Sequence, residues 1–265
     1  MIVSGALAGH GVGSVILEGK ALHLSRYNPK PMNEIQRNRL YFIRHGENPA
    51  NINKVFSSRI VDQSLTEKGV LQAQQTAAYI NGLGINRESW ASGCVYSSPL
   101  RRAIETAGIV AEQLDLTVCI NEAFREIDVG DLENSPTRQA DWSYHRKVMD
   151  DWYDGKNDSG FPGGENYHDL WIRLKTALLE ITSQITDQNV IVIGHGGIMT
   201  VTLKDLCPGI DLEWLRATGW DNCAITEIEL ETQGNELFGT LVSWNKTDHL
   251  SGEAAELIPG VPEGT

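Results

Sequence analysis

The chain has 265 residues, of which 41% are hydrophobic and 22% are charged, and its formal net charge is −13. This composition is that of a globular protein with one sizeable core, and it excludes an intrinsically disordered chain. The negative charge argues against a surface that binds nucleic acid or an anionic membrane. The longest apolar runs, such as residues 189–193, are too short to span a bilayer.

Residues 1–38 are predicted to form an N-terminal extension. Residues 14–18 and 21–25 favour two short strands that turn at Gly19-Lys20, and a proline-containing linker follows at residues 28–31. We expect this β-hairpin either to add to a sheet edge or to form a homodimer contact. Since the first residues lack a basic segment and glycines interrupt them, no signal peptide is expected.

Strands and helices alternate from residue 39 onward. Apolar runs predict strands at residues 40–44, 94–97, 116–120 and 189–193, and helical periodicity predicts helices at residues 66–83, 99–114, 139–152, 165–186 and 197–206. Thr66 and Ser98 are the expected N-caps of the first two helices. Two antiparallel strands at residues 224–230 and 236–244 complete the domain, and the tail, residues 251–265, is expected to be loose. The pattern predicts an α/β fold, with a mostly parallel central sheet flanked by helices on both faces.

Polar residues follow three of the predicted parallel strands, at residues 44–46, 97–102 and 194–197. Ligands of such folds bind beyond the carboxyl ends of the strands, so these segments are expected to converge in one pocket. Arginines there would hold the oxygens of a phosphoryl group, and a histidine with one free ring nitrogen could attack the phosphorus.

Six motifs carry a resemblance to a known family. They read RHGENPAN at residues 44–51, DQSLTEKG at 62–69, SSPLRRAIETA at 97–107, FREIDVG at 124–130, PGGE at 162–165 and GHGG at 194–197. In this order they resemble the motifs of the histidine phosphatase superfamily, also called the phosphoglycerate mutase family. The resemblance covers residues 39–250 and implies a phosphoglycerate mutase-like fold.

The resemblance also implies residue roles. His45 would be the nucleophile that becomes a phosphohistidine, Arg44 and Arg102 would clamp the phosphate, and His195 would donate across it. Glu126 would protonate the leaving oxygen and then activate water. Polar contacts to phosphate or substrate would come from Asn51, Ser57, Gly46 and Gly196.

Several neighbouring residues remain alternatives or lie outside these roles. Glu122, Asp128 and Asp131 are rivals of Glu126 as the acid. Arg101 is expected to be a solvated helix residue. Several aromatic residues between the motifs either line the substrate pocket or pack the intervening loop on the core: Trp142, Tyr144, Trp152, Tyr153 and Phe161.

The cysteines Cys94, Cys119, Cys207 and Cys223 form no CxxC pair and no Cys/His cluster. They are expected to be free thiols in a reducing cytoplasm, and neither a metal nor a cofactor is expected. The predicted partner is a small phosphorylated substrate. Neither nucleic acid nor a membrane is expected to bind.

The expected reaction is hydrolysis of the phosphate monoester of a small metabolite. Phosphoglycerate mutase-type phosphotransfer, a protein phosphatase and a non-catalytic binding protein remain alternatives. The acidic balance of residues 131–161 suits a bisphosphate site poorly, which favours the phosphatase. One departure from the family is DLEN at residues 131–134, where many members have xWEG, so the pocket mouth is expected to differ.

Overall fold

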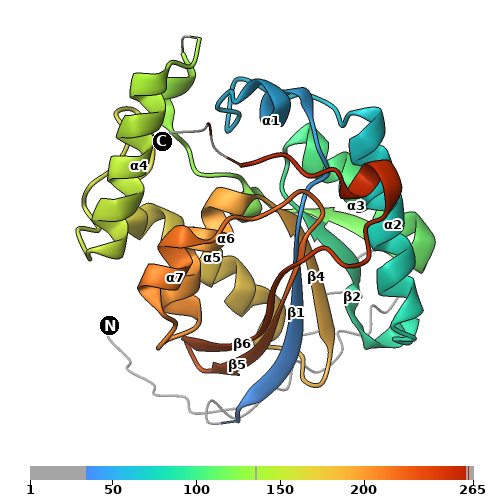
Figure 1. Cartoon of the computed structure of the whole chain (residues 1–265). Helices are drawn as coiled ribbons and strands as arrows, with labels where there is room; N and C mark the ends of the chain where they lie inside the picture. Colours follow the sequence, from blue (N-terminus) through green and yellow to red (C-terminus); the bar gives the residue numbers. More distant parts are fainter. Residues whose placement is uncertain (1–33, 135, 261, 263–265) are drawn as a thin grey trace, which may run out of the picture. The chain divides into compact units, whose positions relative to one another are not determined.

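A computed structural model describes residues 34–134, 136–260 and 262 (Figure 1). Its strands form one sheet in the order β3-β2-β4-β1-β5-β6. Their bounds are β1 (Gln36–Arg44), β2 (Trp90–Ser97), β3 (Thr117–Ile120), β4 (Asn189–Gly194), β5 (Ile225–Gln233) and β6 (Glu236–Lys246). Strands β3, β2, β4 and β1 run parallel, whereas β5 and β6 are antiparallel additions. The predicted α/β fold with a mostly parallel sheet is confirmed, and the predicted hairpin at residues 14–25 lies outside the described residues.

Helices cover both faces of the sheet (Figure 1). Their bounds are α1 (Pro49–Asn53), α2 (Glu67–Gly82), α3 (Arg101–Leu114), α4 (Gln139–Tyr153), α5 (Tyr167–Thr182), α6 (Gly196–Leu206) and α7 (Leu212–Ala217). Alternate residues of β1 explain the two layers, because successive side chains of a strand point to opposite faces. Leu40 and Phe42 join the core cluster that contains residues of α5 and α6, whereas Tyr41 and Ile43 join the cluster formed with α2 and α3.

The ends of several elements differ from the sequence prediction. Strand β1 begins at Gln36, and it pairs there with Thr232 of β5, so residues 36–38 belong to the sheet. Thr66 caps α2 as predicted, since its Oγ1 accepts the Gly69 N–H at 3.0 Å. Ser98 does not cap α3, which begins two residues later than expected, after Leu100. The two short helices α1 and α7 were not predicted. None of the helices in the described part of the chain is both long and apolar enough to cross a membrane.

The prediction of a loose C-terminal tail is wrong for the described residues up to 260. Leu250 and Ala254 are buried, and the tail runs along α2. Gln72 of α2 donates to the carbonyl of Ala254 at 3.2 Å, and Gln75 accepts the Ser251 N–H at 2.7 Å. Hydrogen bonds between α2 side chains and the backbone of the tail therefore fix the tail. Such contacts require no periodic pattern of apolar residues in the tail, which is why the sequence did not predict them.

Two cysteines form a disulfide, which corrects the expectation of four free thiols. Cys94 of β2 and Cys119 of β3 are bonded, and their Cα atoms are 5.8 Å apart. The cysteines are 25 residues apart in sequence, but parallel pairing of β2 with β3 around the α3 crossover brings them side by side. Cys207 and Cys223 are free and buried, as expected of thiols.

Candidate active site

His45 and His195 follow neighbouring parallel strands at matching positions. Arg44, the last residue of β1, pairs with Gly194, the last residue of β4, and each histidine comes next. The His45 N–H donates to the Gly194 carbonyl at 3.0 Å, and the two imidazole ring centres are 5.1 Å apart. Sheet register thus brings together two residues that are far apart in the chain.

The His45 ring is oriented by a hydrogen bond at each nitrogen. Its Nδ1 lies 2.7 Å from the Gly46 carbonyl and donates to it, which leaves Nε2 without a proton. That Nε2 accepts from Arg102 Nε at 2.9 Å. Burial, reinforced by the charges of Arg102 and Arg44, holds the pKa of His45 well below its usual range. His45 is therefore neutral near pH 7, with an unprotonated nitrogen bonded to Arg102.

Arg102 is the second residue of α3 and lies between the two histidines. Besides His45, it donates to His195 Nδ1 at 3.1 Å and to the hydroxyl and carbonyl of Ser57 at 2.9 and 2.7 Å. Burial lowers the pKa of Arg102 to about 10, so the guanidinium stays charged at neutral pH. The neighbouring Arg101 is exposed and pairs with Glu105, as its predicted solvated position requires.

His195 is also neutral. Its Nδ1 accepts from Arg102, so its Nε2 carries the proton and donates to the Ser98 hydroxyl at 2.7 Å. Burial and the nearby charge of Arg102 hold the pKa of His195 well below its usual range. Ser98, which sequence pattern assigned to a helix cap, serves instead to orient His195.

Arg44 carries a buried hydrogen-bond donor that is not paired with any described residue. One terminal nitrogen donates to the Trp220 carbonyl, but the buried Nε has no hydrogen-bond partner within the part of the chain that the structure describes, and the residue is only 7% exposed. This Nε lies at the start of α6, where a Cβ added to Gly196 would lie 3.6 Å from it. A buried cationic donor without a partner is costly, and an anion bound there would satisfy it.

Glu126 lines the same pocket, and its carboxylate receives three backbone N–H groups. Gly197 and Ile198 at the start of α6 donate at 3.0 and 2.9 Å, and Ile127 donates at 2.9 Å. A Cβ at Gly197 would lie 2.6 Å from the carboxylate, so this approach requires glycine. The glutamate thus bridges its own loop and the helix that follows His195.

The three rival carboxylates of Glu126 do not line the pocket. Glu122 is exposed and pairs with Arg125, Asp128 pairs with Arg59, and Asp131 accepts from Asn134. Position therefore favours Glu126 among the four candidates, and its role as acid and base stays a prediction.

The remaining predicted residues lie around the histidines. Asn51 lines the pocket, and its side-chain oxygen accepts from the Asn222 amide at 3.0 Å. The same Asn222 amide donates to the His45 carbonyl at 3.0 Å. Gly46 packs backbone to backbone against Gly69, whose carbonyl would lie 2.4 Å from an added Cβ. Sequence reasoning missed Asn222 because no strand or glycine motif marks it.

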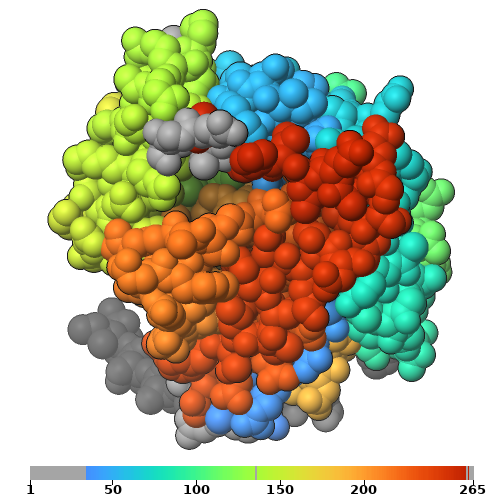
Figure 2. Space-filling view, viewed as in Figure 1, coloured from blue at the N-terminus to red at the C-terminus, as the bar shows by residue number. Residues whose placement is uncertain are grey.

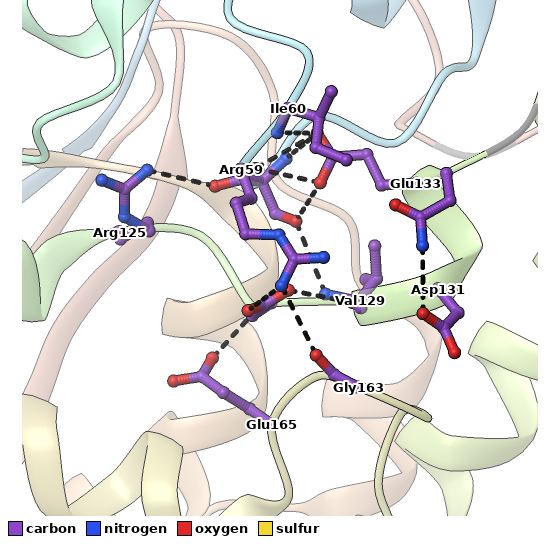
Figure 3. Close-up of polar contacts among 12 residues, drawn as sticks. Arg59, Ile60, Arg125, Val129, Asp131, Glu133, Gly163 and Glu165 are labelled. Atoms are coloured by element: carbon purple, nitrogen blue, oxygen red, sulfur yellow. Dashed lines mark hydrogen bonds and ion pairs between the residues drawn. The ribbon is translucent and has the colours of Figure 1, made fainter.

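The loop at residues 57–61 is fixed by one buried carboxylate, that of Glu133 (Figure 3). It accepts the backbone N–H groups of residues 58 to 61 at 2.7 to 3.1 Å, and the Ser58 hydroxyl donates to it at 2.6 Å. Burial alone would raise the pKa of Glu133, but these hydrogen bonds outweigh burial and lower it. Glu133 stands in the segment that departs from the family pattern, and it holds the loop that carries Ser57.

One pocket of about 360 Å³ is lined by most of the predicted site residues, whereas His195 and Gly46 are not among its lining residues. Figure 2 shows the hollow between α4, α7 and the C-terminal segment. At its base lie Arg44, His45, Arg102 and Glu126. Among the described residues, no group of three or more His, Cys, Asp or Glu side chains is placed to hold a metal ion. The arrangement combines two buried cations, a nucleophilic nitrogen and a carboxylate in one cavity.

Comparison with known families matches this geometry. The sequence pattern of the histidine phosphatase superfamily (branch 1) covers residues 40–247, and the chain belongs to this superfamily. Its members include phosphatases and phosphoglycerate mutases, and they are enzymes.

The named relatives also include both phosphatases and phosphoglycerate mutases. A protein of Hydrogenobacter thermophilus, provisionally named phosphoserine phosphatase 2, is 30% identical over 80% of this chain and 97% of its own length. A protein of Proteus mirabilis, provisionally named phosphoglycerate mutase GpmB, is 28% identical over 72% of this chain and 85% of its own. The solved structure of a mycobacterial glucosyl-3-phosphoglycerate phosphatase complexed with VO3 shares the fold, with a TM-score of 0.64, 22% identity and coverage of 79% of this chain and 99% of that one.

Proposed function

We propose that this protein is a phosphatase that hydrolyses phosphate monoesters through a phosphohistidine on His45. The carrying observation is the unprotonated Nε2 of His45, held 2.9 Å from Arg102 Nε in a buried pocket that also contains the unpartnered Nε of Arg44. If a phosphoryl group lay between the two arginines, their N–H groups would donate to its oxygens, and Arg102 Nε would release the His45 nitrogen. The phosphorus would then face the nitrogen lone pair.

Two displacements follow from this placement. The Nε2 lone pair forms the N–P bond while the P–O bond to the leaving alcohol breaks, and Glu126, which enters this step protonated, gives that oxygen its proton. Glu126 then takes a proton from water as the water attacks the phosphohistidine, which releases phosphate and restores His45. Dividing hydrolysis into two displacements is the usual advantage of covalent catalysis. No metal takes part in either proposed step.

Ion pairs in residues 138–156 favour the phosphatase over the mutase. A mutase must hold a second phosphate, which needs cations that are available to it. Arg138 pairs with Asp141 at 2.8 Å, and Lys147 and Lys156 both pair with Asp151. None of these three cations lines the pocket, so they provide no site beside His45 for a second phosphate.

The first experiment measures phosphate release from p-nitrophenyl phosphate in the presence of a chelator. Wild-type protein is expected to release phosphate and to trap acid-labile, alkali-stable label from a ³²P-substrate. His45→Ala should lose both signals, whereas the matched control His168→Ala, at an exposed histidine beside Asp158, should keep them. Equal release by wild type and His45→Ala would refute the proposal, and interconversion of 3- and 2-phosphoglycerate faster than hydrolysis would establish the mutase.

The partner and location are also proposals. A small phosphorylated metabolite suits a pocket of about 360 Å³, and the acidic chain disfavours nucleic acid and anionic membranes. A cytoplasmic location stays a proposal, and the Cys94–Cys119 disulfide removes the thiol argument for it. The sheet-edge addition or homodimer contact expected of the hairpin at residues 14–25 stays a prediction, since these residues lie outside those described.

A further inference from the structure

The pocket continues outward from the phosphate clamp into a chamber with apolar walls. One face of α4 supplies Trp142, His145, Met149 and Tyr153, whose spacing of three and four residues places them along one side of the helix. Other parts of the wall come from Phe56, Val201, Leu215 and Trp220. The chamber lies where the leaving alcohol of a phosphate bound at His45 would extend.

The aromatic walls are neutral and fixed by packing. The rings of Phe56 and Trp142 are 4.4 Å apart, and His145 stacks on Phe161 with ring centres 5.6 Å apart. Burial lowers the pKa of His145 to about 4, so its ring is uncharged at neutral pH. The indole N–H of Trp142 is already bonded to the Lys54 carbonyl at 3.0 Å. These groups therefore present uncharged rings and ring edges to a ligand.

Most polar and cationic groups around the chamber are already engaged, although the Arg216 Nε has no hydrogen-bond partner among the described residues and lies 3.9 Å from Glu213 Oε1. Arg216 pairs with Asp150 and Asp154 and lies over the Tyr153 ring, 5.2 Å from its centre. Lys54 donates to the Pro259 carbonyl, and the Thr200 hydroxyl donates to the Gly196 carbonyl.

Arg146 also lines the pocket and has an interaction of its own. A leaving group with a carboxylate or a second phosphate would have to displace such contacts, whereas an apolar group would displace only water.

The geometry points to a phosphate monoester whose leaving alcohol carries a bulky apolar group, aromatic or branched aliphatic, as the substrate class. This inference rests on the proposed phosphatase function and narrows it, away from compact anionic metabolites. A volume of about 360 Å³ lies within the range of ligand pockets and exceeds what a phosphate alone requires. Apolar walls with a few convergent charges at the base are the usual design of such pockets.

Three primary alkyl phosphates test the inference with similar leaving-group chemistry: propyl, 3-phenylpropyl and 3-carboxypropyl phosphate. The expected order of kcat/KM is phenylpropyl above propyl by about tenfold or more, and carboxypropyl below propyl. Trp142→Ala should reduce the phenylpropyl-to-propyl ratio by about tenfold. The matched control Trp214→Ala, at an exposed tryptophan that does not line the pocket, should leave the ratio unchanged.

The outcomes separate this inference from the function on which it rests. Hydrolysis that depends on His45 but shows equal rates for propyl and phenylpropyl phosphate, or a preference for carboxypropyl phosphate, would overturn the substrate class and keep the phosphatase. A preference that survives Trp142→Ala would overturn the assignment to this chamber. Hydrolysis of none of the esters, including p-nitrophenyl phosphate, would overturn both.

Discussion

The Glu133 carboxylate accepts the backbone N–H of Val61 at 2.7 Å, across 72 residues of sequence. This contact is one of several that fix residues 58–61 to a single buried side chain (Figure 3). The same loop presents Ser57, whose hydroxyl and carbonyl hold Arg102. Arg102 in turn holds the Nε2 of His45, so a chain of direct contacts joins Glu133 to the proposed nucleophile.

Glu133→Gln should weaken both stability and catalysis. The NH₂ group of glutamine would face backbone N–H groups, which are also donors, so some hydrogen bonds would be lost. Loss of these charge-assisted hydrogen bonds should lower the free energy of unfolding by about 2 kcal/mol. Loop disorder should reduce kcat more than it raises KM, since Arg102 would lose its orientation. Urea unfolding and steady-state kinetics measure the two effects. Glu122→Gln, at an exposed glutamate that pairs with Arg125, is the control, and matching results for both variants would refute the positioning role.

Arg102→Lys should reduce kcat/KM by about 10²- to 10³-fold. Lysine keeps the charge but cannot donate at once to His45, His195 and Ser57 as the guanidinium fork does. Arg101→Lys is the matched control, because the Arg101 side chain is exposed and pairs with Glu105, while its backbone N–H donates to the Asp62 carboxylate. A larger loss for Arg101→Lys would reverse the assignment of the clamping arginine.

Glu126→Gln should impair poor leaving groups more than good ones. If Glu126 protonates the leaving oxygen, hydrolysis of an alkyl phosphate should fall by about 10²- to 10⁴-fold, whereas p-nitrophenyl phosphate, whose phenolate leaves without help, should be less affected. Comparing kcat for the two esters measures the difference. Asp128→Asn tests the nearest rival, and equal losses for both esters in Glu126→Gln would indicate that its bonds to Gly197 and Ile198 are purely structural.

Stability should fall as the pH decreases from 6.5 toward 4. The pKa values of His45, His145 and His195 are lowered by burial, and that of His145 is about 4. Unfolded histidines have a pKa near 6.5, so in this interval the unfolded chain binds more protons and is favoured, by on the order of 3 kcal/mol for His145 alone. Urea unfolding at pH 7, 6 and 5 should show the decrease.

A substitution identifies the histidine responsible. His145→Gln should flatten the decrease between pH 7 and pH 5, since it removes one group that must charge on unfolding. His168→Gln, at an exposed position, should leave the slope unchanged. A stability that stays constant from pH 7 to pH 5 would contradict neutral buried histidines.

The central sheet and the two histidines could be predicted because their signals are local. Each histidine follows an apolar strand and precedes glycine, and parallel pairing of those strands brings the rings together. Contacts between residues in distant loops could not be predicted, because no local sequence pattern marks them. Asn222 lies 177 residues from His45 in sequence, and Glu133 acts through backbone groups that carry no side-chain pattern.

The tail and the disulfide were mispredicted for a related reason. The tail is fixed by side chains of α2 that donate to its backbone, so its own residues need no periodicity. The pairing of Cys94 with Cys119 depends on strand order, which sequence spacing alone does not determine.

The Cys94–Cys119 bridge fastens the outermost strand of the sheet. Strand β3 has four residues and lies at the edge, where it covers the backbone donors and acceptors of β2. Once reduced, β3 would be attached by backbone pairing and a few side chains, and its detachment would leave β2 as a bare edge that can template pairing with another chain. A reducing agent would therefore cause the protein to self-associate before it alters the phosphate pocket.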